Sequence, residues 1–181
     1  MPMRTLPLVI LSIAYPLLVF FLLGRFEPRW LSLLLFALAL LRAIGTKERH
    51  WRWIAAVTGG LAGWALLSNG ALPLKLYPVL VNAGLLLLFG LSLKFGMPLI
   101  ERLARLREPE LPPEAVAYTR RVTQVWCVFF VVNGGIALAT ALWASERIWA
   151  LYNGLIAYGL IGALFVGEWL VRQRVKARLH D

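Results

Sequence analysis

The sequence predicts an all-α, polytopic integral membrane protein, with residues 1–181 forming a single transmembrane domain that crosses the bilayer about six times. Three observations support this fold class. The chain is 60% hydrophobic, which exceeds the usual content of water-soluble domains. Its apolar residues gather in runs close to the roughly 20 residues that a membrane-spanning helix needs. Its 19 lysines and arginines lie at the ends of these runs, and not on the solvated basic face that nucleic-acid binding requires.

Six apolar segments are expected to span the membrane. They lie near residues 6–24, 28–45, 53–70, 77–95, 122–143 and 148–171. The first has no small-residue cleavage pattern near its end, so we interpret it as a retained anchor that Pro16 kinks in its middle. The second is the weakest, since its uncharged core from Trp30 to Leu41 would be only about 18 Å long at about 1.5 Å per residue. It crosses if Arg29 and Arg42 extend their cations toward the headgroups, and whether it fully spans stays open.

The basic residues predict the orientation of the chain, because short cytoplasmic loops carry an excess of lysine and arginine. With six spans, fifteen of the 19 basic residues fall on one side of the membrane and four on the other. The four are Arg25, Arg29, Lys75 and Arg147. This distribution predicts that both termini are cytoplasmic. If the second segment does not cross, the amino terminus moves outside while the later loops keep their places.

Aromatic residues at the ends of the expected spans favour the same arrangement, since tryptophan and tyrosine rings prefer the membrane–water interface. The outer ends carry Trp30, Tyr77, Trp143, Trp149 and Tyr152. The inner ends carry Trp51, Trp53, Trp126 and Trp169. The sequence therefore predicts two aromatic belts.

The stretch 96–121, which we call the elbow, is the one substantial polar insert and is expected in the cytoplasm. Its first half places Leu99, Ile100, Leu103 and Leu106 on one helical stripe with arginines beside it. This pattern predicts an amphipathic helix on the membrane surface, and the alternative is a simple extension of the preceding helix. The basic side chains of the elbow form a candidate surface for a cytoplasmic partner or for anionic lipid headgroups. They are Arg102, Arg105, Arg107, Arg120 and Arg121.

Small residues inside the expected spans are spaced for close helix packing. Gly59 and Gly63 form a Gly-x-x-x-Gly pair, and Gly159, Ala163 and Gly167 continue the same spacing over two turns. Whether these contacts lie within one chain or between copies, as in a homo-oligomer, stays open.

Polar residues within the expected spans form the candidate intramembrane site. They are Asn82, Asn133, Asn153 and Glu168. Each asparagine is expected to bond to a neighbouring helix, and the alternative is a polar cavity for a lipid headgroup or an acyl carrier. An acidic group inside a span indicates function by default. Glu168, however, lies four residues before Arg172, and this spacing favours an ion pair along the helix.

No pattern for catalysis, cofactor binding or metal binding is present in the sequence. His50 and His180 have no cysteine or carboxylate at ligand spacing, and the single cysteine, Cys127, can form no internal disulfide. There is no nucleophile elbow and no phosphate-binding loop with a lysine. We therefore expect no catalytic residues, cofactor or metal, and the chain is better interpreted as a non-enzyme than as an integral acyltransferase.

One region resembles a known family. Its residues are Leu111-Pro112-Pro113-Glu114-Ala115, Tyr118-Thr119-Arg120-Arg121-Val122-Thr123, Gln124-Val125-Trp126-Cys127-Val128-Phe129-Phe130 and Asn133-Gly134. They resemble the signature of an uncharacterised bacterial inner-membrane family, whose members are encoded among the synthases and acyltransferases of aryl-polyene (xanthomonadin-type) pigment clusters. The chain from Tyr77 to Arg172 is also distantly similar to the intracellular septation protein A family. Neither resemblance implies catalytic residues.

Two classes of function follow. The first is a non-enzymatic accessory or scaffold protein of the bacterial inner (cytoplasmic) membrane, serving lipid or aryl-polyene-type biosynthesis or cell-envelope maintenance. Its expected partners are membrane lipids and cytoplasmic biosynthetic enzymes. The second is a small lipid or acyl-chain carrier or transporter that uses the three asparagines around a cavity.

Overall fold

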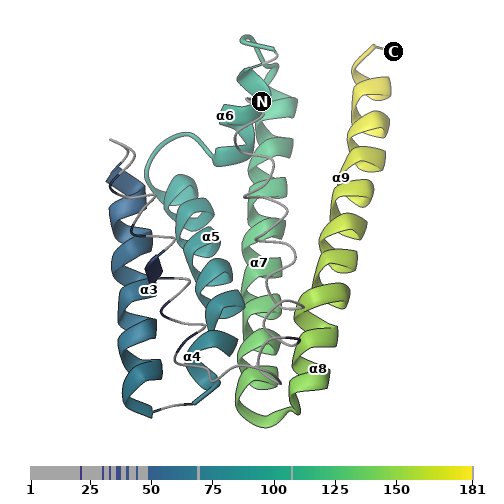
Figure 1. Ribbon diagram of the computed structural model, residues 1–181. Helices are drawn as coiled ribbons and strands as arrows, with labels where there is room; N and C mark the ends of the chain where they lie inside the picture. Colours follow the sequence, from purple (N-terminus) through teal and green to yellow (C-terminus); the bar gives the residue numbers. More distant parts are fainter. Residues whose placement is uncertain are drawn as a thin grey trace. The chain divides into compact units, whose positions relative to one another are not determined.

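The computed structural model describes residues 21, 30, 33, 36, 37, 40, 44, 49–68, 70–106 and 108–180. The regular structure in these residues is helical, with no strand among them (Figure 1). The chain divides into two compact units. The first unit comprises Met1–Tyr77 with Ala139–Gly154, and the second comprises Pro78–Leu138 with Leu155–Asp181. The expected spans near 6–24 and 28–45 lie outside the described residues, apart from single helical positions such as Trp30 and Phe36.

The described residues of the first unit include α3 (Arg49–Ser68), α4 (Leu72–Lys75) and α8 (Glu146–Leu151). The Ser68 hydroxyl ends α3 by donating to the Trp64 carbonyl at 2.9 Å and accepting from the Gly70 amide at 3.3 Å. Gly59 lies against Phe36, because a Cβ atom added there would lie 2.7 Å from the Phe36 ring. The expected contact at Gly59 is therefore formed, whereas Gly63 has no neighbour within 4 Å of such an atom.

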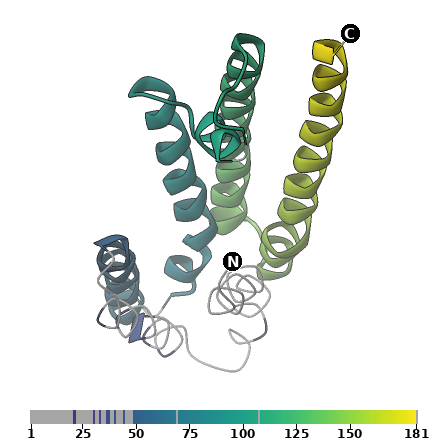
Figure 2. The ribbon, with the colours of Figure 1, turned by 90° about the horizontal axis from the view of Figure 1, so that it is seen from above.

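The second unit is built from α5 (Tyr77–Lys94), α6 (Leu99–Arg105), α9 (Ala157–His180) and most of α7 (Pro113–Trp143), whose last residues from Ala139 belong to the first unit. Proline occupies the first position of α7, where a missing backbone N–H breaks no helical hydrogen bond. Figure 2 shows α7 between α5 and α9. A π-helix, Tyr152–Ile156, joins α8 to α9.

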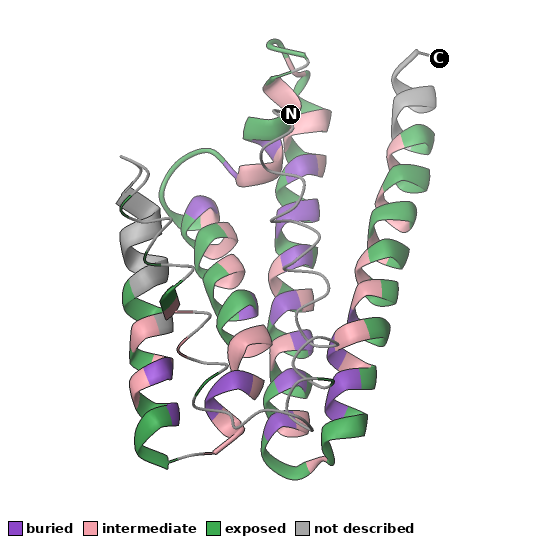
Figure 3. Ribbon diagram, viewed as in Figure 1, coloured by how far each residue is buried: buried purple, intermediate pink, exposed green. Residues whose placement is uncertain are grey.

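Three described stretches are long and apolar enough to cross a membrane, which agrees with three of the expected spans. They are Leu72–Lys94, Pro113–Trp143 and Glu146–Arg174. In α3, Gly59–Ser68 is a shorter apolar stretch, and the expected span near 53–70 begins at residues whose side chains lie outside the described ones. The outer faces of α5, α7 and α9 carry exposed residues along most of their length (Figure 3). Many of these are large and apolar, including Leu87, Val128 and Leu160, as expected of helices that contact lipid.

An aromatic cluster on α7 forms the core of the second unit. Trp126 is buried with Val122 and Phe130, and its ring lies 6.3 Å from that of Phe89 on α5 and 4.8 Å from that of Phe165 on α9. Aromatic pairs at such separations add to the free energy gained from burial alone. One tryptophan thus joins three helices.

The expected aromatic belts are wrong at two positions. Trp126 is 6% exposed and Trp149 is 0% exposed, so neither ring is available to headgroups. Trp149 instead donates from its indole nitrogen to the Lys75 carbonyl of the first unit at 3.1 Å. A tryptophan satisfies its apolar ring and its single donor equally well in a core, which is why sequence position alone misassigned these two. Trp30, Trp143 and Trp169 are exposed, as a belt requires.

Candidate functional site

Asn82 and Asn133 face each other across α5 and α7. The Asn133 amide nitrogen donates to the Asn82 side-chain oxygen at 3.0 Å, and the Asn82 amide nitrogen donates to the Pro78 carbonyl at 2.8 Å. Both side chains are buried. Gly134 lies at the same contact, because a Cβ atom there would be 3.0 Å from the Asn82 Cβ. The glycine lets the two helices approach closely enough for the amide–amide bond, so the expected cross-helix bond is formed.

Asn153 belongs to the first unit and has different partners. Its amide nitrogen donates to the Trp149 carbonyl at 2.9 Å and to the Thr140 hydroxyl oxygen at 3.2 Å. The residue lies in the π-helix, a feature that the sequence reasoning missed and that often occurs at functional positions. The only local signal was an asparagine followed by Gly154 inside an apolar run. Of the three candidate asparagines, hydrogen bonds thus join Asn82 to Asn133, while Asn153 is held separately.

Glu168 forms the expected ion pair along α9. Its carboxylate lies 3.6 Å from the Nε atom of Arg172. A second partner comes from α7, since the Tyr118 hydroxyl contacts the Glu168 backbone carbonyl at 3.1 Å and its carboxylate at 3.3 Å. Sequence reasoning did not find Tyr118, because it lies 50 residues from Glu168 in the chain. Glu168 therefore ties α9 to α7 at the end of the unit that carries the elbow (Figure 1).

The elbow begins with a sharp break after α5. Gly96 adopts a φ of +112°, a conformation that side-chain-bearing residues rarely reach, and Pro98 precedes the first residue of α6. The buried Ser92 hydroxyl accepts a 3.0 Å hydrogen bond from the Leu99 amide and donates to the Phe89 carbonyl at 2.7 Å. The alternative of a simple extension of the preceding helix is therefore wrong, and α6 is a separate helix held to the last turn of α5.

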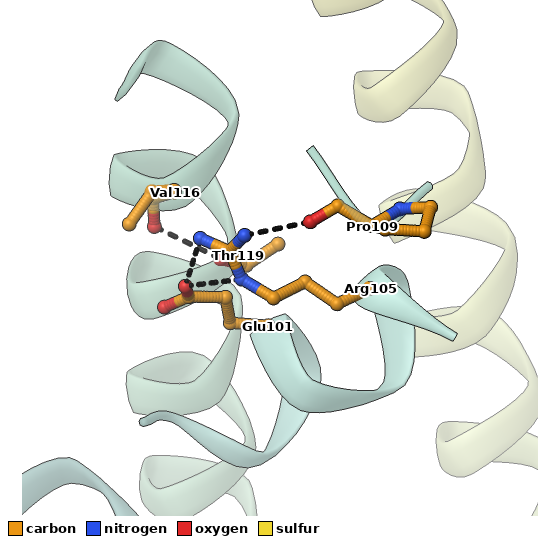
Figure 4. A network of polar contacts seen from close by, with 5 residues as sticks. All are labelled: Glu101, Arg105, Pro109, Val116 and Thr119. Atoms are coloured by element: carbon orange, nitrogen blue, oxygen red, sulfur yellow. Dashed lines mark hydrogen bonds and ion pairs between the residues drawn. The ribbon is translucent and has the colours of Figure 1, made fainter. Parts of the chain in front are cut away.

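A buried ion pair holds the elbow together (Figure 4). Glu101 is 6% exposed, and one of its carboxylate oxygens accepts from the Arg105 Nε atom at 2.9 Å and lies 2.8 Å from an Arg105 Nη atom. The other Nη atom of Arg105 donates to the Pro109 carbonyl at 2.9 Å. The same view includes α7, where the Thr119 hydroxyl donates to the Val116 carbonyl at 2.9 Å. Arg105 thus stabilises the fold of the elbow. Its position one helical turn after Glu101 could have indicated this ion pair from the sequence.

The other candidate arginines differ in the contacts that they make with the rest of the chain. Arg120 is exposed and makes a long contact of 3.5 Å with the Leu93 carbonyl of α5. Arg102 is exposed and contacts the Met97 carbonyl at 3.4 Å. Arg121 is exposed and has no ion-pair or hydrogen-bond partner among the described residues. Arg107 lies outside the described residues. Among the described arginines of the elbow, Arg121 makes no such contact, while Arg102 and Arg120 each make one long contact with a backbone carbonyl.

No group of three or more histidine, cysteine, aspartate or glutamate residues that could hold a metal ion lies in the part of the chain that the structure describes. Comparison with protein-family models, with curated proteins and with solved structures finds no match. In the part of the chain that the structure describes, the regular structure is helical, and three helices are long and apolar enough to cross a membrane. Its functional interpretation rests on the elbow and on the polar contacts between its helices.

Proposed function

We propose that this chain is a non-enzymatic accessory protein of the bacterial inner membrane, whose elbow recruits cytoplasmic enzymes of lipid or aryl-polyene-type biosynthesis. In this proposal the chain crosses the membrane six times with both termini in the cytoplasm, as the fifteen-to-four distribution of basic residues favours. The observation that carries the proposal is the built structure of the elbow, which displays cations on a defined scaffold.

Three sets of contacts support this interpretation of the elbow. Ser92 holds the start of α6, Arg105 joins Glu101 to Pro109, and Arg120 reaches back to α5. A loop that only connects two spans does not need such a network, because solvent can satisfy its backbone groups. A preformed surface, by contrast, lowers the entropy lost when a partner binds. The elbow therefore has the properties of a docking surface.

The carrier function receives no comparable support. A carrier needs polar groups that are open to a cargo, whereas Asn82 and Asn133 bond to each other and Asn153 donates to two protein oxygens. These bonds are the usual means by which asparagine joins helices in a membrane. We therefore assign the asparagines to helix packing.

The experiment that tests the proposal is capture of partners by the tagged, full-length protein from detergent-solubilised membranes with cytoplasm. Arg102→Glu combined with Arg121→Glu should lower the recovery of acyl-chain or polyene synthases by about tenfold, since charge reversal turns attraction to an acidic partner into repulsion. Arg105 is left intact because its loss would unfold the elbow. The matched control is Arg174→Glu, which reverses an exposed cation on α9 and should leave recovery unchanged. Equal recovery from the double variant and the parent, or no such enzyme with either, would overturn the proposal.

A further inference from the structure

The outward side of α6 is apolar and uncovered. Leu103 is 52% exposed and Leu106 is 80% exposed, and Phe95, in the turn before α6, is 68% exposed. Met97 in the same turn is also exposed. Monomeric soluble proteins rarely leave large apolar side chains gathered in this way, because each exposes area that water disfavours. The face of the elbow formed by Phe95, Met97, Leu103 and Leu106, which we call the apolar face, therefore needs an apolar environment.

The inward side of α6 fixes which residues point outward. Ile100 packs against the cluster of Val122, Trp126 and Phe130, and Glu101 is buried in its pair with Arg105. The apolar residues that the sequence places on one stripe of this helix therefore point in two directions. Ile100 is directed to the core, whereas Leu103 and Leu106 are directed away from it. Because the Leu99 amide bonds to Ser92 of α5 and Ile100 packs on the α7 cluster, α6 cannot rotate to bury its leucines against the second unit.

The contacts of α6 also fix its level along the bundle. Leu99 bonds to Ser92, which lies two residues before the end of α5, and Ile100 packs against the cluster that begins at Val122, the first residue of the expected span 122–143. Both neighbours mark the boundary between the apolar and polar parts of their helices. A helix held at this boundary lies at the depth of the lipid headgroups if α5 and α7 span the bilayer.

Cations surround the apolar face. Lys94 places its ammonium group 5.2 Å from the centre of the Phe95 ring, and Arg102 is exposed on α6 itself. Arg121 is exposed one residue before the start of the expected span. An apolar face bordered by lysine and arginine matches the surface of a leaflet that contains anionic phospholipids.

We infer that α6 is an interfacial anchor, which inserts Leu103, Leu106 and Phe95 into the acyl boundary of the cytoplasmic leaflet and binds anionic phospholipid headgroups through Lys94, Arg102 and Arg121. The occupant of the apolar face is the bilayer and not a protein, because the contacts to Ser92 and Val122 hold the face level with the ends of spanning helices. This inference rests on the membrane orientation in the proposed function and adds the lipid class that the elbow binds.

Site-specific fluorescence in vesicles tests the anchor. In full-length protein with Cys127→Ser, an environment-sensitive dye is attached at Leu106→Cys or, separately, at Leu103→Cys. Each variant is reconstituted in vesicles of phosphatidylcholine with or without one quarter phosphatidylglycerol. With phosphatidylglycerol present, both dyes should emit at shorter wavelength and be quenched by a shallow lipid-borne spin label. Quenching should fall at least twofold without the anionic lipid. The control dye at Glu110→Cys, an exposed position of the same elbow, should respond to soluble iodide only.

Three outcomes would overturn the inference. The first is quenching of the Leu103 and Leu106 dyes by iodide to the same extent as the Glu110 dye. The second is equal lipid quenching in both kinds of vesicle, which would show that the elbow does not bind anionic headgroups. The third is a shift that occurs only when cytoplasmic enzymes are added, which makes the apolar face a protein contact. These vesicles contain no partner enzyme. A negative result therefore contradicts the membrane anchor and does not bear on the proposed capture of enzymes. Both leucines are already exposed, and an unchanged helical circular dichroism spectrum verifies that the variants fold.

Discussion

The side chains of Asn133 and Asn82 form a 3.0 Å amide–amide hydrogen bond between α7 and α5, in which Asn133 is the donor and Asn82 the acceptor. Asn82 in turn donates to the Pro78 carbonyl of its own helix. This chain of two bonds gives the Asn82 side chain both an acceptor and a donor partner within the second unit. Its contribution to the packing of α5 on α7 is measurable.

A double-mutant cycle on this pair should show a coupling free energy of about 0.6 kcal/mol, and no more than about 1.7 kcal/mol, since such bonds in membrane proteins are individually weak. The cycle uses Asn82→Ala, Asn133→Ala and the double variant, with unfolding followed in mixed micelles of increasing denaturing detergent. If the two single effects simply add, the bond contributes nothing to stability. Gln124→Ala, at an exposed position of α7, is the control for a change of side-chain size.

Two adjacent glycines of α7 should respond differently to the same substitution. Gly134→Leu should destabilise the protein by about 1–3 kcal/mol, because the added side chain meets the Asn82 Cβ, which cannot move without its backbone. Gly135→Leu should have little effect, since no atom of the described residues lies within 4 Å of a Cβ built there. Unfolding of the two variants in the same detergent series measures the difference. Equal destabilisation would show that α5 does not pack at Gly134.

The two partners of Glu168 should contribute unequally. Tyr118→Phe should cost about 1 kcal/mol, because it removes a part-buried hydroxyl that contacts two oxygens of Glu168. Arg172→Gln should cost about 0.3–0.5 kcal/mol, since the Arg172 side chain is 44% exposed and the pair joins two positions of one helix. Unfolding at low and high salt provides the readout, and only the Arg172 effect should shrink with salt. The reverse order of costs would contradict the tie between α7 and α9.

Removing Arg105 should loosen the elbow while leaving the spans intact. Arg105→Gln leaves the buried Glu101 carboxylate without its cation and should cost about 1.5–3 kcal/mol of local stability. Hydrogen exchange of the amides in α6 should then be faster by about tenfold or more, with little change in α7. Arg102→Gln is the matched control, because this exposed arginine lies on the same short helix and its one contact is long. Unchanged exchange in the Arg105 variant would show that the ion pair does not hold the elbow.

The parts of the fold that depend on local pattern were predictable from the sequence. Three of the expected apolar runs lie in helices that are long and apolar enough to cross a membrane, because only a helix satisfies every backbone group without water. The pair of Glu168 with Arg172 and the separate α6 also follow from spacing and from the glycine and proline between helices. These features involve residues that lie within a few positions of one another.

The parts that depend on distant neighbours were not predictable. Tyr118 and Glu168 are 50 residues apart, and Asn82 and Asn133 are 51 apart, so nothing local joins either pair. Trp126 resembles an interface residue until its neighbours Phe89 and Phe165 are known. The small residues of α9 were expected to mark a close contact, but within the part of the chain that the structure describes no atom lies within 4 Å of a Cβ added at Gly159 or Gly167. Packing decides these cases, and one sequence does not show which helices meet.

The bond between Ser92 and Leu99 spans only seven residues and closes before any residue of α7 is needed. The pair of Glu101 with Arg105 is equally local. During synthesis, α5 and α6 can therefore adopt their bent arrangement as soon as both have left the ribosome. The side chain of Ile100 can then be in place before α7 packs against it. The turn at Gly96 depends on local contacts alone, whereas the contacts of Tyr118 and Trp126 require α9, which follows later in the chain.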